Sequence, residues 1–559
     1  MTRSGEANRT ISGERHPHPR TLSGHLSWRV RAAPEQTFVV ATGSDGSMQE
    51  LSFANLDRQA RAFAALLTAL GVVKGDTVHV QLGNCPEFLV CLFGVAHLGA
   101  VLVPTHPSAT VDDVIYVTSH AGCRVSVVTA EQVPVIASVA GMVPELTQIL
   151  SVSGPAVGAI DVADTVDVDA DVDPVQLDGG ELAAVLYTSG TSGWPKGVMV
   201  THANLLFAGQ SVAELFRVRP ADRWLVTLPL SHANALIYQT MSAFVTGASV
   251  ALIDRFDPAT WAHSGRRHSA TLASLFAVHA RQLLAEPATA SASEAALKLR
   301  LTVFAQHLQA HERAELERRF GTRLIQVYGL TETLAPTLCE QVYGPPEPDT
   351  VGRPTSWVQT RLVDDDGRTV SAGVPGQLQV QGVPGVTLMA GYFSRPEATG
   401  RVLRDGWLST GDQMLLLADG SYAFLGRGEE ILKPGVDNVS TAEIERVLLE
   451  HVSVTDAAVI GIQQEDEEEE IVAFVVLRPG DDATTGEVFA WARERLSSHK
   501  VPHRLLGIEE LPRSAVGKVL RRDLRQRAAN SVIGFSEGER RAAVAHPAPA
   551  PQDKPDDQP

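Results

Sequence analysis

The chain has 559 residues, of which 44% are hydrophobic, and it carries a formal net charge of -18 at pH 7. This length is too great for one hydrophobic core, so at least two domains are expected. The acidic balance argues against nucleic acid or an anionic membrane as the main partner. No apolar run approaches the length of a membrane span, and the polar first twenty residues lack the apolar stretch of a signal peptide.

The cysteines and the one long acidic run do not indicate a metal site. Cys85, Cys91, Cys123 and Cys339 show no C-x-x-C spacing, which argues against both a zinc site and a disulfide framework. We expect buried thiols in a reducing compartment, the cytoplasm. The acidic run at residues 465–470 is expected to be a solvated loop, because nothing around it would hold a metal geometry.

The first 330 residues alternate between helix and strand patterns. A helical stripe over residues 56–70 is followed by an alternating strand pattern over 76–82. An apolar helix over 88–99 and strand-like segments over 100–104 and 125–128 come next. This alternation predicts an α/β core of parallel-type sheets flanked by helices.

The pattern changes after Gly352. Segments punctuated by Gly and Pro, such as 360–363 and 377–381, predict a small β region. A compact α+β unit is expected from about Arg427, and its first helix would open with the capping box Ser440-x-x-Glu443. We therefore expect a disordered tail over 1–25, an N-terminal domain over 26–426, a small mobile C-terminal domain over 427–530, and a disordered tail over 531–559.

Residues 187–198 read YTSGTSGWPKGV and follow an apolar stretch, so they predict a loop entered from a buried strand. Glycines let backbone N–H groups turn toward an anion, hydroxyls add donors, and Lys196 supplies a point charge. The candidate phosphate contacts are Thr188, Ser189, Gly190, Thr191, Ser192, Gly193 and Lys196. A flexible Ser/Gly turn is the alternative. A Walker loop does not fit, because Trp194-Pro195 stands between Gly193 and Lys196.

Two further motifs each follow a predicted strand. The segment Pro229-Leu-Ser-His232 comes after the strand pattern of 224–228, where a histidine could also be purely structural. The segment Tyr328-Gly-Leu-Thr-Glu332 comes after the apolar residues 324–327. An aromatic face can stack on a base and a carboxylate can hold Mg²⁺, although a Tyr-Gly turn with a surface Glu is the alternative.

Three motifs lie in the last third of the chain. Residues 405–412 read DGWLSTGD, and the final carboxylate, Asp412, could accept hydrogen bonds from two hydroxyls. Residues 426–433 read GRGEEILK. Residues 512–522 read PRSAVGKVLRR, with Lys518 between a turn and an apolar pair, as expected for a lysine delivered on a loop rather than a solvated surface lysine.

In this order, the motifs resemble those of the adenylate-forming superfamily, which comprises acyl- and aryl-CoA synthetases, peptide-synthetase adenylation domains and luciferases. The resemblance covers roughly residues 30–527. It implies a two-step reaction in which a carboxylate and ATP form an acyl-adenylate and pyrophosphate, and a thiol then takes the acyl group. The cofactors and co-substrates it implies are ATP, Mg²⁺, and either CoA or a phosphopantetheine thiol.

The resemblance also implies a role for each matched residue. The catalytic residues would be Lys518, Glu332, Thr331 and His232, and Glu332 would be the Mg²⁺ ligand. Besides the phosphate loop, the nucleotide would be bound by Tyr328, Gly329, Asp412 and Arg427. The segment 426–433 would connect the two domains, with Glu429 as the hinge residue. Gly435, just after it, would make a backbone contact with the entering thiol arm of the co-substrate.

The acid pocket departs from the common pattern of the superfamily. Residues 304–308 read FAQHL where many relatives have a small S-G-G-A-like turn, and this change must alter the adenine or acyl wall. Carnitine-type CoA ligases and β-amino-acid ligases are similar in lacking the double glycine. The pocket candidates are His232, Asn234, Ala305, Gln306, His307 and Leu330.

Three functions remain open at this point. The leading one is an acid–thiol ligase acting on CoA or on an acyl or peptidyl carrier protein. The second is a stand-alone amino-acid or β-amino-acid ligase that loads a carrier protein in natural-product biosynthesis. No Asp or Glu lies in residues 224–252 to pair with a substrate ammonium, which disfavours this second function. The third is a catalytically decayed binding protein, which is disfavoured by the retained residues Lys196, Glu332, Asp412, Arg427 and Lys518.

Overall fold

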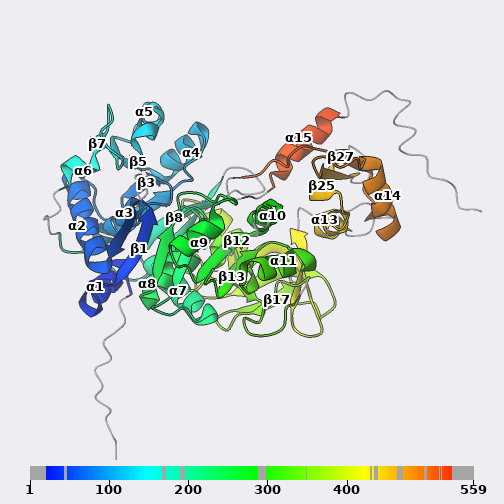
Figure 1. Ribbon diagram of the computed structural model, residues 1–559. Coiled ribbons are helices and arrows are strands. Elements are labelled where there is room, and N and C mark those ends of the chain that lie inside the picture. Colours follow the sequence, from blue (N-terminus) through cyan, green and yellow to red (C-terminus); the bar gives the residue numbers. More distant parts are fainter. Residues whose placement is uncertain are drawn as a thin grey trace, which may run out of the picture. The chain divides into compact units, whose positions relative to one another are not determined.

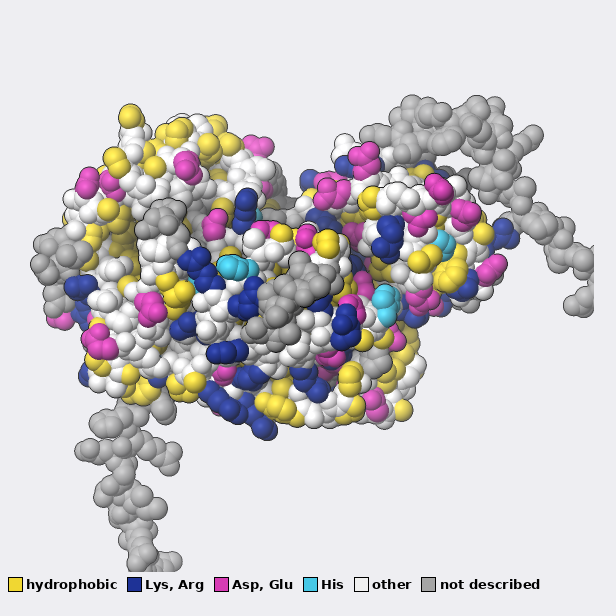
Figure 2. All heavy atoms as spheres, viewed as in Figure 1, with side chains coloured by type: hydrophobic (Ala, Val, Ile, Leu, Met, Phe, Trp, Pro, Cys, Tyr) yellow, Lys and Arg dark blue, Asp and Glu magenta, His cyan; other side chains and the backbone are white. Residues whose placement is uncertain are grey.

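The computed structural model describes residues 20–42, 47–166, 172–188, 195–287, 297–347, 349–427, 431–432, 439–462, 470–496, 500–514, 517 and 519–531. The chain divides into two compact units, Met1–Phe424 and Leu425–Pro559. The expected boundary after residue 426 lies beside this division. The face shown in Figure 2 carries basic and acidic side chains among apolar ones. Within the described residues, no helix is long and apolar enough to cross a membrane.

The first helix corrects the expected N-terminal tail. Helix α1 (Leu22–Ala32) begins inside residues 1–25, which we had expected to be disordered. The side chain of Thr21 caps it by accepting from the N–H of Gly24 at 3.2 Å. The side chains of Leu22 and Leu26 are fully buried. Their packing against the domain stabilises the helix, although the sequence before it is polar.

An eight-stranded sheet carries the phosphate-loop candidate. Its order is β19-β9-β8-β4-β3-β5-β6-β7. The strands are β3 (Thr77–Gln81), β4 (Val101–Pro104), β5 (Val125–Val128), β6 (Gln148–Ser151), β7 (Ile160–Asp161), β8 (Leu182–Thr188), β9 (Lys196–Thr201) and β19 (Gly391–Tyr392). The helices between them are α2 (Phe53–Ala69), α3 (Pro86–Leu98), α4 (Val111–Ala121), α5 (Val133–Ala140) and α6 (Val162–Thr165). Figure 1 shows α4 and α5 next to β5.

A nine-stranded sheet carries the nucleotide and acid candidates. Its order is β16-β15-β14-β13-β12-β10-β11-β1-β2. The strands are β1 (Thr37–Thr42), β2 (Met48–Ser52), β10 (Arg223–Val226), β11 (Ser249–Leu252), β12 (Leu272–Phe276), β13 (Leu301–Ala305), β14 (Leu324–Tyr328), β15 (Leu338–Cys339) and β16 (Arg353–Pro354). The helices are α7 (His202–Phe216), the π-helix η2 (Asn234–Met241), α8 (Ser242–Thr246), α9 (Trp261–Arg267), α10 (Ala277–Ala285) and α11 (Ala310–Phe320).

The α/β fold is confirmed, but the two large sheets are mixed rather than purely parallel. The pairs β1–β2, β8–β9, β9–β19, β14–β15 and β15–β16 are antiparallel. Between β8 and β9 the reason is the connection, because only residues 189–195 join them. A parallel crossover needs roughly a dozen residues or more, so a short connection produces a hairpin.

The small β region is a five-stranded sheet. It pairs β17 (Gln359–Val363), β18 (Gly376–Gln381), β21 (Trp407–Leu416) and β20 (Leu403–Arg404) in that order, with β22 (Tyr422–Arg427) beside β21. Helix α12 (Pro396–Val402) precedes β20. Leu378 and Val380 are fully buried while Gln377, Gln379 and Gln381 are less so, which is the alternation expected of a sheet with one covered face.

The second unit is a small α+β fold. The three-stranded sheet β25 (Val454–Ile462), β26 (Glu470–Leu477) and β27 (Arg504–Gly507) has one antiparallel and one parallel pairing. Helices α13 (Thr441–Leu449) and α14 (Thr485–Arg495) cover one face, and α15 (Arg521–Ser531) packs on the other. A short pair, β23 (Ile431–Leu432) and β24 (Val439–Ser440), precedes α13. Ile444, Val447 and Leu448 are on the buried face of α13.

Candidate functional site

The phosphate-loop candidate begins and ends on the β8–β9 hairpin. Thr188 ends β8 and is paired with Lys196, which begins β9. Gly197 is held close to the stem, because a Cβ there would lie 2.6 Å from Val185 and 3.1 Å from the ring of Tyr187. The predicted contacts Ser189, Gly190, Thr191, Ser192 and Gly193 fall outside the described part of the chain.

A tyrosine that the sequence motifs did not single out joins two predicted site residues. Tyr392 lies on β19, which pairs with β9 beside the hairpin. Its hydroxyl donates to Oε1 of Glu332 at 2.8 Å, and the ammonium of Lys196 lies 5.1 Å from its ring centroid. The N–H of Phe393 also donates to the carbonyl of Gly197 at 2.7 Å. The only local signal is an aromatic pair after Gly391, which does not distinguish this tyrosine from a core residue.

Tyr328 and Asp412 form the second joined pair. Tyr328 ends β14, and its hydroxyl donates to Oδ2 of Asp412 at 2.5 Å. Asp412 lies on β21 and is 2% exposed. Its N–H donates to Oγ1 of Thr410 at 3.1 Å. The two motifs are 84 positions apart, so the fold, rather than local sequence, brings an aromatic ring and a carboxylate together.

The turn after Tyr328 requires its glycine. A Cβ at Gly329 would lie 2.6 Å from the hydroxyl oxygen of Tyr238, a buried residue of η2. Thr331 and Glu332 then form a single 3₁₀ turn. Leu330 is half-buried, and its N–H donates to Oγ1 of Thr333 at 2.9 Å. Tyr238 therefore marks a contact between the π-helix and the Tyr-Gly motif that the sequence did not reveal.

The unusual segment Ala305-Gln306-His307 begins at the last residue of β13 and is held by its backbone. The carbonyl of Gln306 accepts from Nε2 of Gln326 at 3.1 Å, and the carbonyl of His307 accepts from Arg281 at 3.0 Å. Gln306 has φ 74, in the left-handed region that favours glycine, and its side chain is exposed. A conformation that costs an L-residue about 1–2 kcal/mol is thus maintained by two hydrogen bonds from neighbouring elements.

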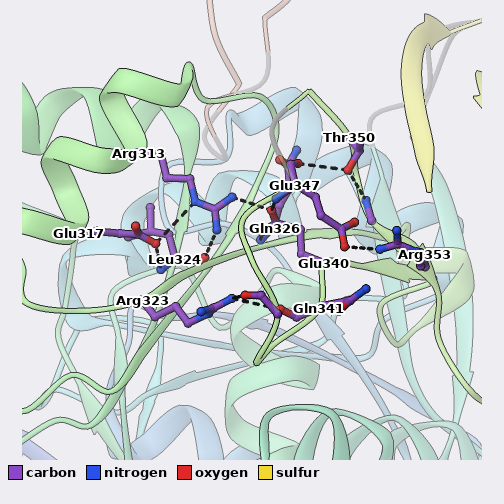
Figure 3. Close-up of polar contacts among 12 residues, drawn as sticks. Arg313, Glu317, Arg323, Leu324, Gln326, Glu340, Gln341, Glu347, Thr350 and Arg353 are labelled. Carbon is purple, nitrogen blue, oxygen red and sulfur yellow. Dashed lines mark hydrogen bonds and ion pairs between the residues drawn. The ribbon is translucent and has the colours of Figure 1, made fainter. Parts of the chain in front are cut away.

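A buried charge network supports the strand that carries Tyr328. Figure 3 shows the guanidinium of Arg313 directed at Glu340, and the two groups are 2.6 Å apart. Oε2 of Glu340 accepts from the N–H of Gln326 at 2.8 Å, and Oε1 accepts from the N–H of Glu347 at 2.9 Å. Because Gln326 also bonds the carbonyl of Gln306, the network holds both β14 and the Gln306 turn. Removing one partner would leave a buried charge uncompensated, which is strongly destabilising.

His232 and Asn234 lie at the start of the π-helix. The N–H of Asn234 donates to Nδ1 of His232 at 3.2 Å, and the His232 ring packs edge-on against Phe276 with centroids 5.6 Å apart. Asn234 is 4% exposed, and its Oδ1 accepts from Nε2 of Gln239 at 3.0 Å. π-Helical turns are frequently found at functional sites. This one presents uncharged polar and aromatic groups.

The predicted residues of the second unit are only partly described. Arg427 is the last residue of β22 and is half-buried. Glu429, Gly435 and Lys518 are not among the described residues. The described residues on either side of position 518 are joined, because the N–H of Leu520 donates to the carbonyl of Pro512 at 2.7 Å and Arg513 donates to the carbonyl of Gly517 at 2.6 Å.

The donor set of the first unit fits a single Mg²⁺ ion that also binds a substrate. No group of three or more His, Cys, Asp or Glu within the described ranges could hold a metal by itself. Mg²⁺ usually takes one or two carboxylates and completes its shell with phosphate oxygens and water. Glu332, oriented by Tyr392 beside Lys196, is the carboxylate suited to this role.

Comparison with known proteins places the chain in a family. It matches the AMP-binding enzymes over residues 26–393 and the AMP-binding enzyme C-terminal domain over residues 443–518. The chain belongs to this family, which confirms the resemblance to adenylate-forming enzymes. It is an AMP-forming acid–thiol ligase of the acyl-CoA synthetase type.

Named relatives and solved structures agree with this membership. The crotonobetaine/carnitine–CoA ligases of Citrobacter koseri and Salmonella arizonae are each 31% identical to the chain, covering 88% of it and 96% of each relative. ATP-bound MatB from Rhodopseudomonas palustris is 26% identical with a TM-score of 0.82, covering 92% of this chain and 99% of MatB. The anthranilate CoA ligase AuaEII in complex with anthranoyl-AMP has a TM-score of 0.84 at 24% identity, covering 92% and 99% of the two chains.

Proposed function

We propose that the described residues of the first unit act on MgATP and a carboxylic acid to form an acyl-adenylate, whose acyl group then passes to the thiol of CoA. The observation that carries this proposal is the convergence of Lys196, Tyr392 and Glu332 on one side and of Tyr328 and Asp412 on the other. These groups supply a cation, a metal-binding carboxylate, an aromatic face and a hydroxyl acceptor, which together match the parts of ATP.

In the first half-reaction, a carboxylate oxygen attacks the α-phosphorus and the bond to pyrophosphate breaks. Lys196 and the hydroxyl of Thr188 would bind the phosphates, and Asp412 would accept the ribose hydroxyls. Lys518 would offset negative charge between the attacking carboxylate and the α-phosphate. Mg²⁺ held by Glu332 would neutralise charge on the leaving pyrophosphate. In the second half-reaction, a thiol sulfur attacks the acyl carbon and AMP leaves.

We also propose that the acid substrate has no ammonium group with N–H donors. Residues 224–252 contain no Asp or Glu, and hydrogen bonds at the start of the π-helix link His232 to Asn234 and Asn234 to Gln239. A quaternary ammonium needs no hydrogen-bond acceptor and is recognised by aromatic faces. The ring of Phe276, against which His232 packs edge-on, would supply such a face. We therefore propose a short betaine-type acid, as in the names of the relatives, ahead of an amino acid.

Acid-dependent exchange of labelled pyrophosphate into ATP tests the proposed function. The panel contains short betaine-type, fatty, aryl, dicarboxylic and β-amino acids, and positive acids are then offered CoA or a phosphopantetheinylated carrier protein. We expect exchange with a betaine-type acid and transfer to CoA. Transfer only to the carrier protein would show that the acceptor is a carrier-protein thiol rather than CoA. Absence of exchange with every acid would indicate a decayed site.

We also propose a reducing compartment, the cytoplasm, as the site of action. All four cysteines are free thiols. Burial raises the pKa of the Cys91 thiol well above its usual value and that of Cys123 to about 12, so neither forms a reactive thiolate near neutral pH.

A further inference from the structure

Helix α4 packs against the sheet beside the β8–β9 hairpin. It begins with a capping box in which Thr110 and Asp113 exchange hydrogen bonds. Its buried face carries Val117 and Ala121, which pack in one cluster with Val185 of β8. The polar side chains of two residues one turn apart, Tyr116 and His120, reach the hairpin. The helix is therefore anchored independently of these two polar contacts.

His120 contacts the strand that enters the phosphate-loop candidate. Its Nδ1 lies 2.7 Å from the hydroxyl of Tyr187, the residue before Thr188. Burial raises the pKa of Tyr187, so the phenol keeps its proton and donates. Burial and the nearby Arg395 lower the pKa of His120, which favours the neutral ring that accepts. The hydrogen bond thus has a defined direction.

Tyr116 contacts the chain immediately before β9, the strand that leaves the phosphate-loop candidate. Its hydroxyl donates to the carbonyl of Pro195 at 2.8 Å, immediately before Lys196. The Tyr116 and His120 rings stack with centroids 5.4 Å apart, and Tyr187 meets both rings edge-on at 6.2 and 5.8 Å. One face of one helix therefore bonds Tyr187 near the end of β8 and Pro195 just before the start of β9. These two ends of the loop are the stems of the hairpin.

We propose that α4 clamps the two stems, so that Tyr116 and His120 are positioning residues for the ATP half-reaction. The stems carry Thr188 and Lys196, whose one described side-chain link across the hairpin is a 3.4 Å bond from Oγ1 of Thr188 to the carbonyl of Lys196. A shift of about 1 Å in a substrate-positioning group can cost roughly a hundredfold in rate. The clamp rests on the proposed role of this hairpin in binding phosphates.

Separate assays of the two half-reactions test the clamp. The variants are Tyr116→Phe and His120→Phe, which each delete one hydrogen bond to a stem. We expect each to raise the apparent KM for ATP in pyrophosphate exchange about tenfold, the effect of one lost hydrogen bond. Transfer from pre-made acyl-AMP to CoA, which involves no β- or γ-phosphate, should stay within about twofold of wild type.

Two further variants control for packing. His120→Asn keeps a side-chain acceptor near Nδ1 and should restore most of the ATP affinity lost in His120→Phe. Ser119→Ala alters the same surface pocket of about 450 Å³, which Tyr116 and His120 also line, and touches neither stem. It should match wild type in both half-reactions. Thermal unfolding of all four variants verifies that they are folded.

The outcomes separate the clamp from the proposed function. Wild-type protein that shows no exchange with any acid would overturn the proposed function. If wild-type protein exchanges but both Phe variants keep its KM for ATP, the clamp is wrong. An equal loss in both half-reactions would also overturn it, because that result would mark a general structural role.

Discussion

The hydroxyl of Tyr392 donates a 2.8 Å hydrogen bond to Oε1 of Glu332, across 60 positions of sequence. The face of the same ring lies 5.1 Å from the ammonium of Lys196. One side chain therefore orients the candidate metal-binding carboxylate and contacts the candidate phosphate-binding cation.

Tyr392→Phe should lower the rate of pyrophosphate exchange by weakening the binding of Mg²⁺ and ATP. The variant keeps the ring beside Lys196 and loses only the hydrogen bond to the carboxylate, a bond to a charged group worth about 1.5–3 kcal/mol. We expect a loss of roughly tenfold to a hundredfold in pyrophosphate exchange at low Mg²⁺, partly recovered at high Mg²⁺. Tyr422→Phe is the control, because it also removes one tyrosine hydroxyl and its hydrogen bond, here to the neutral hydroxyl of Thr360. Equal Mg²⁺ dependence in both variants would contradict the role of Tyr392.

Asp412→Ala should raise the apparent KM for ATP at least about tenfold, because two charge-assisted hydrogen bonds to the ribose would be lost. Asp412 is 2% exposed, so Asp412→Asn serves as the variant that keeps the side-chain volume. Calorimetric titration with ATP measures the affinity directly. The exposed Asp419→Asn provides the control. Unchanged ATP binding in both Asp412 variants would refute the ribose assignment.

Lys518→Ala should abolish adenylation, with a loss of at least about a hundredfold, while pre-made acyl-AMP still reacts with the thiol. The expected reason is that the lysine offsets charge only while the carboxylate attacks the α-phosphorus. Lys500→Ala removes another cation of the second unit, one paired with Glu443 at 2.8 Å, and should affect neither half-reaction. If Lys518→Ala slowed both half-reactions equally, its role would be structural.

Gln306→Gly should stabilise the protein by roughly 1 kcal/mol while impairing activity. The backbone has φ 74, which costs Gln more than Gly, and the exposed side chain loses little packing when removed. Activity should fall through a higher KM for ATP or for the acid, because the turn follows β13 at the same edge as Tyr328. Gln309→Gly, at an ordinary φ of -64, should not stabilise. Urea unfolding and the exchange assay measure the two effects, and a destabilised Gln306→Gly would contradict the strain.

Acid should destabilise the protein through His79. Its side chain is fully buried between Ser126 and Thr105, and burial lowers its pKa to about 3. The unfolded histidine titrates near 6.5, so between these values the unfolded chain binds a proton that the folded protein excludes. The free energy of unfolding therefore falls as pH falls through this window, by about 2 kcal/mol from this group between pH 7 and 5.

His79→Gln should remove that share of the pH dependence. Urea unfolding at pH 7 and pH 5 should show a smaller loss for this variant than for wild type. The exposed His263→Gln should keep the wild-type pH dependence. An identical loss in His79→Gln and wild type would show that His79 does not cause it.

The sequence predicted the parts of the site that are contiguous in the chain. The loop around Thr188 and Lys196, the Tyr328–Glu332 turn and the Asp412 motif could be recognised because each needs particular residue types at fixed short spacing. Tyr392, Tyr238, Tyr116 and His120 could not be recognised in this way. Each acts through a contact with an element distant in sequence, and a lone aromatic residue has no spacing that distinguishes it from core.

The direction of strand pairing could not be predicted from the sequence either. Alternating helix and strand patterns correctly predicted the α/β class, since periodicity reflects which face of each element is buried. Periodicity carries no information on pairing direction at the sheet edges, so the antiparallel β8–β9 hairpin was not expected. The N-terminal turn of α1 was missed because the packing of Leu22 and Leu26 involves distant elements.

The sequence by itself determined the family and the two-step chemistry, and it supplied candidate residues for each part of ATP, because local motifs encode these directly. Only the tertiary structure decided which of these groups meet. Two sets of contacts depend on strand order and register: those of Tyr392 with Lys196 and Glu332, and that of Tyr328 with Asp412. Strand order and register arise from burial of the whole sheet. Hydrogen bonds of under 3 Å between residues 60 to 84 positions apart are set by that packing.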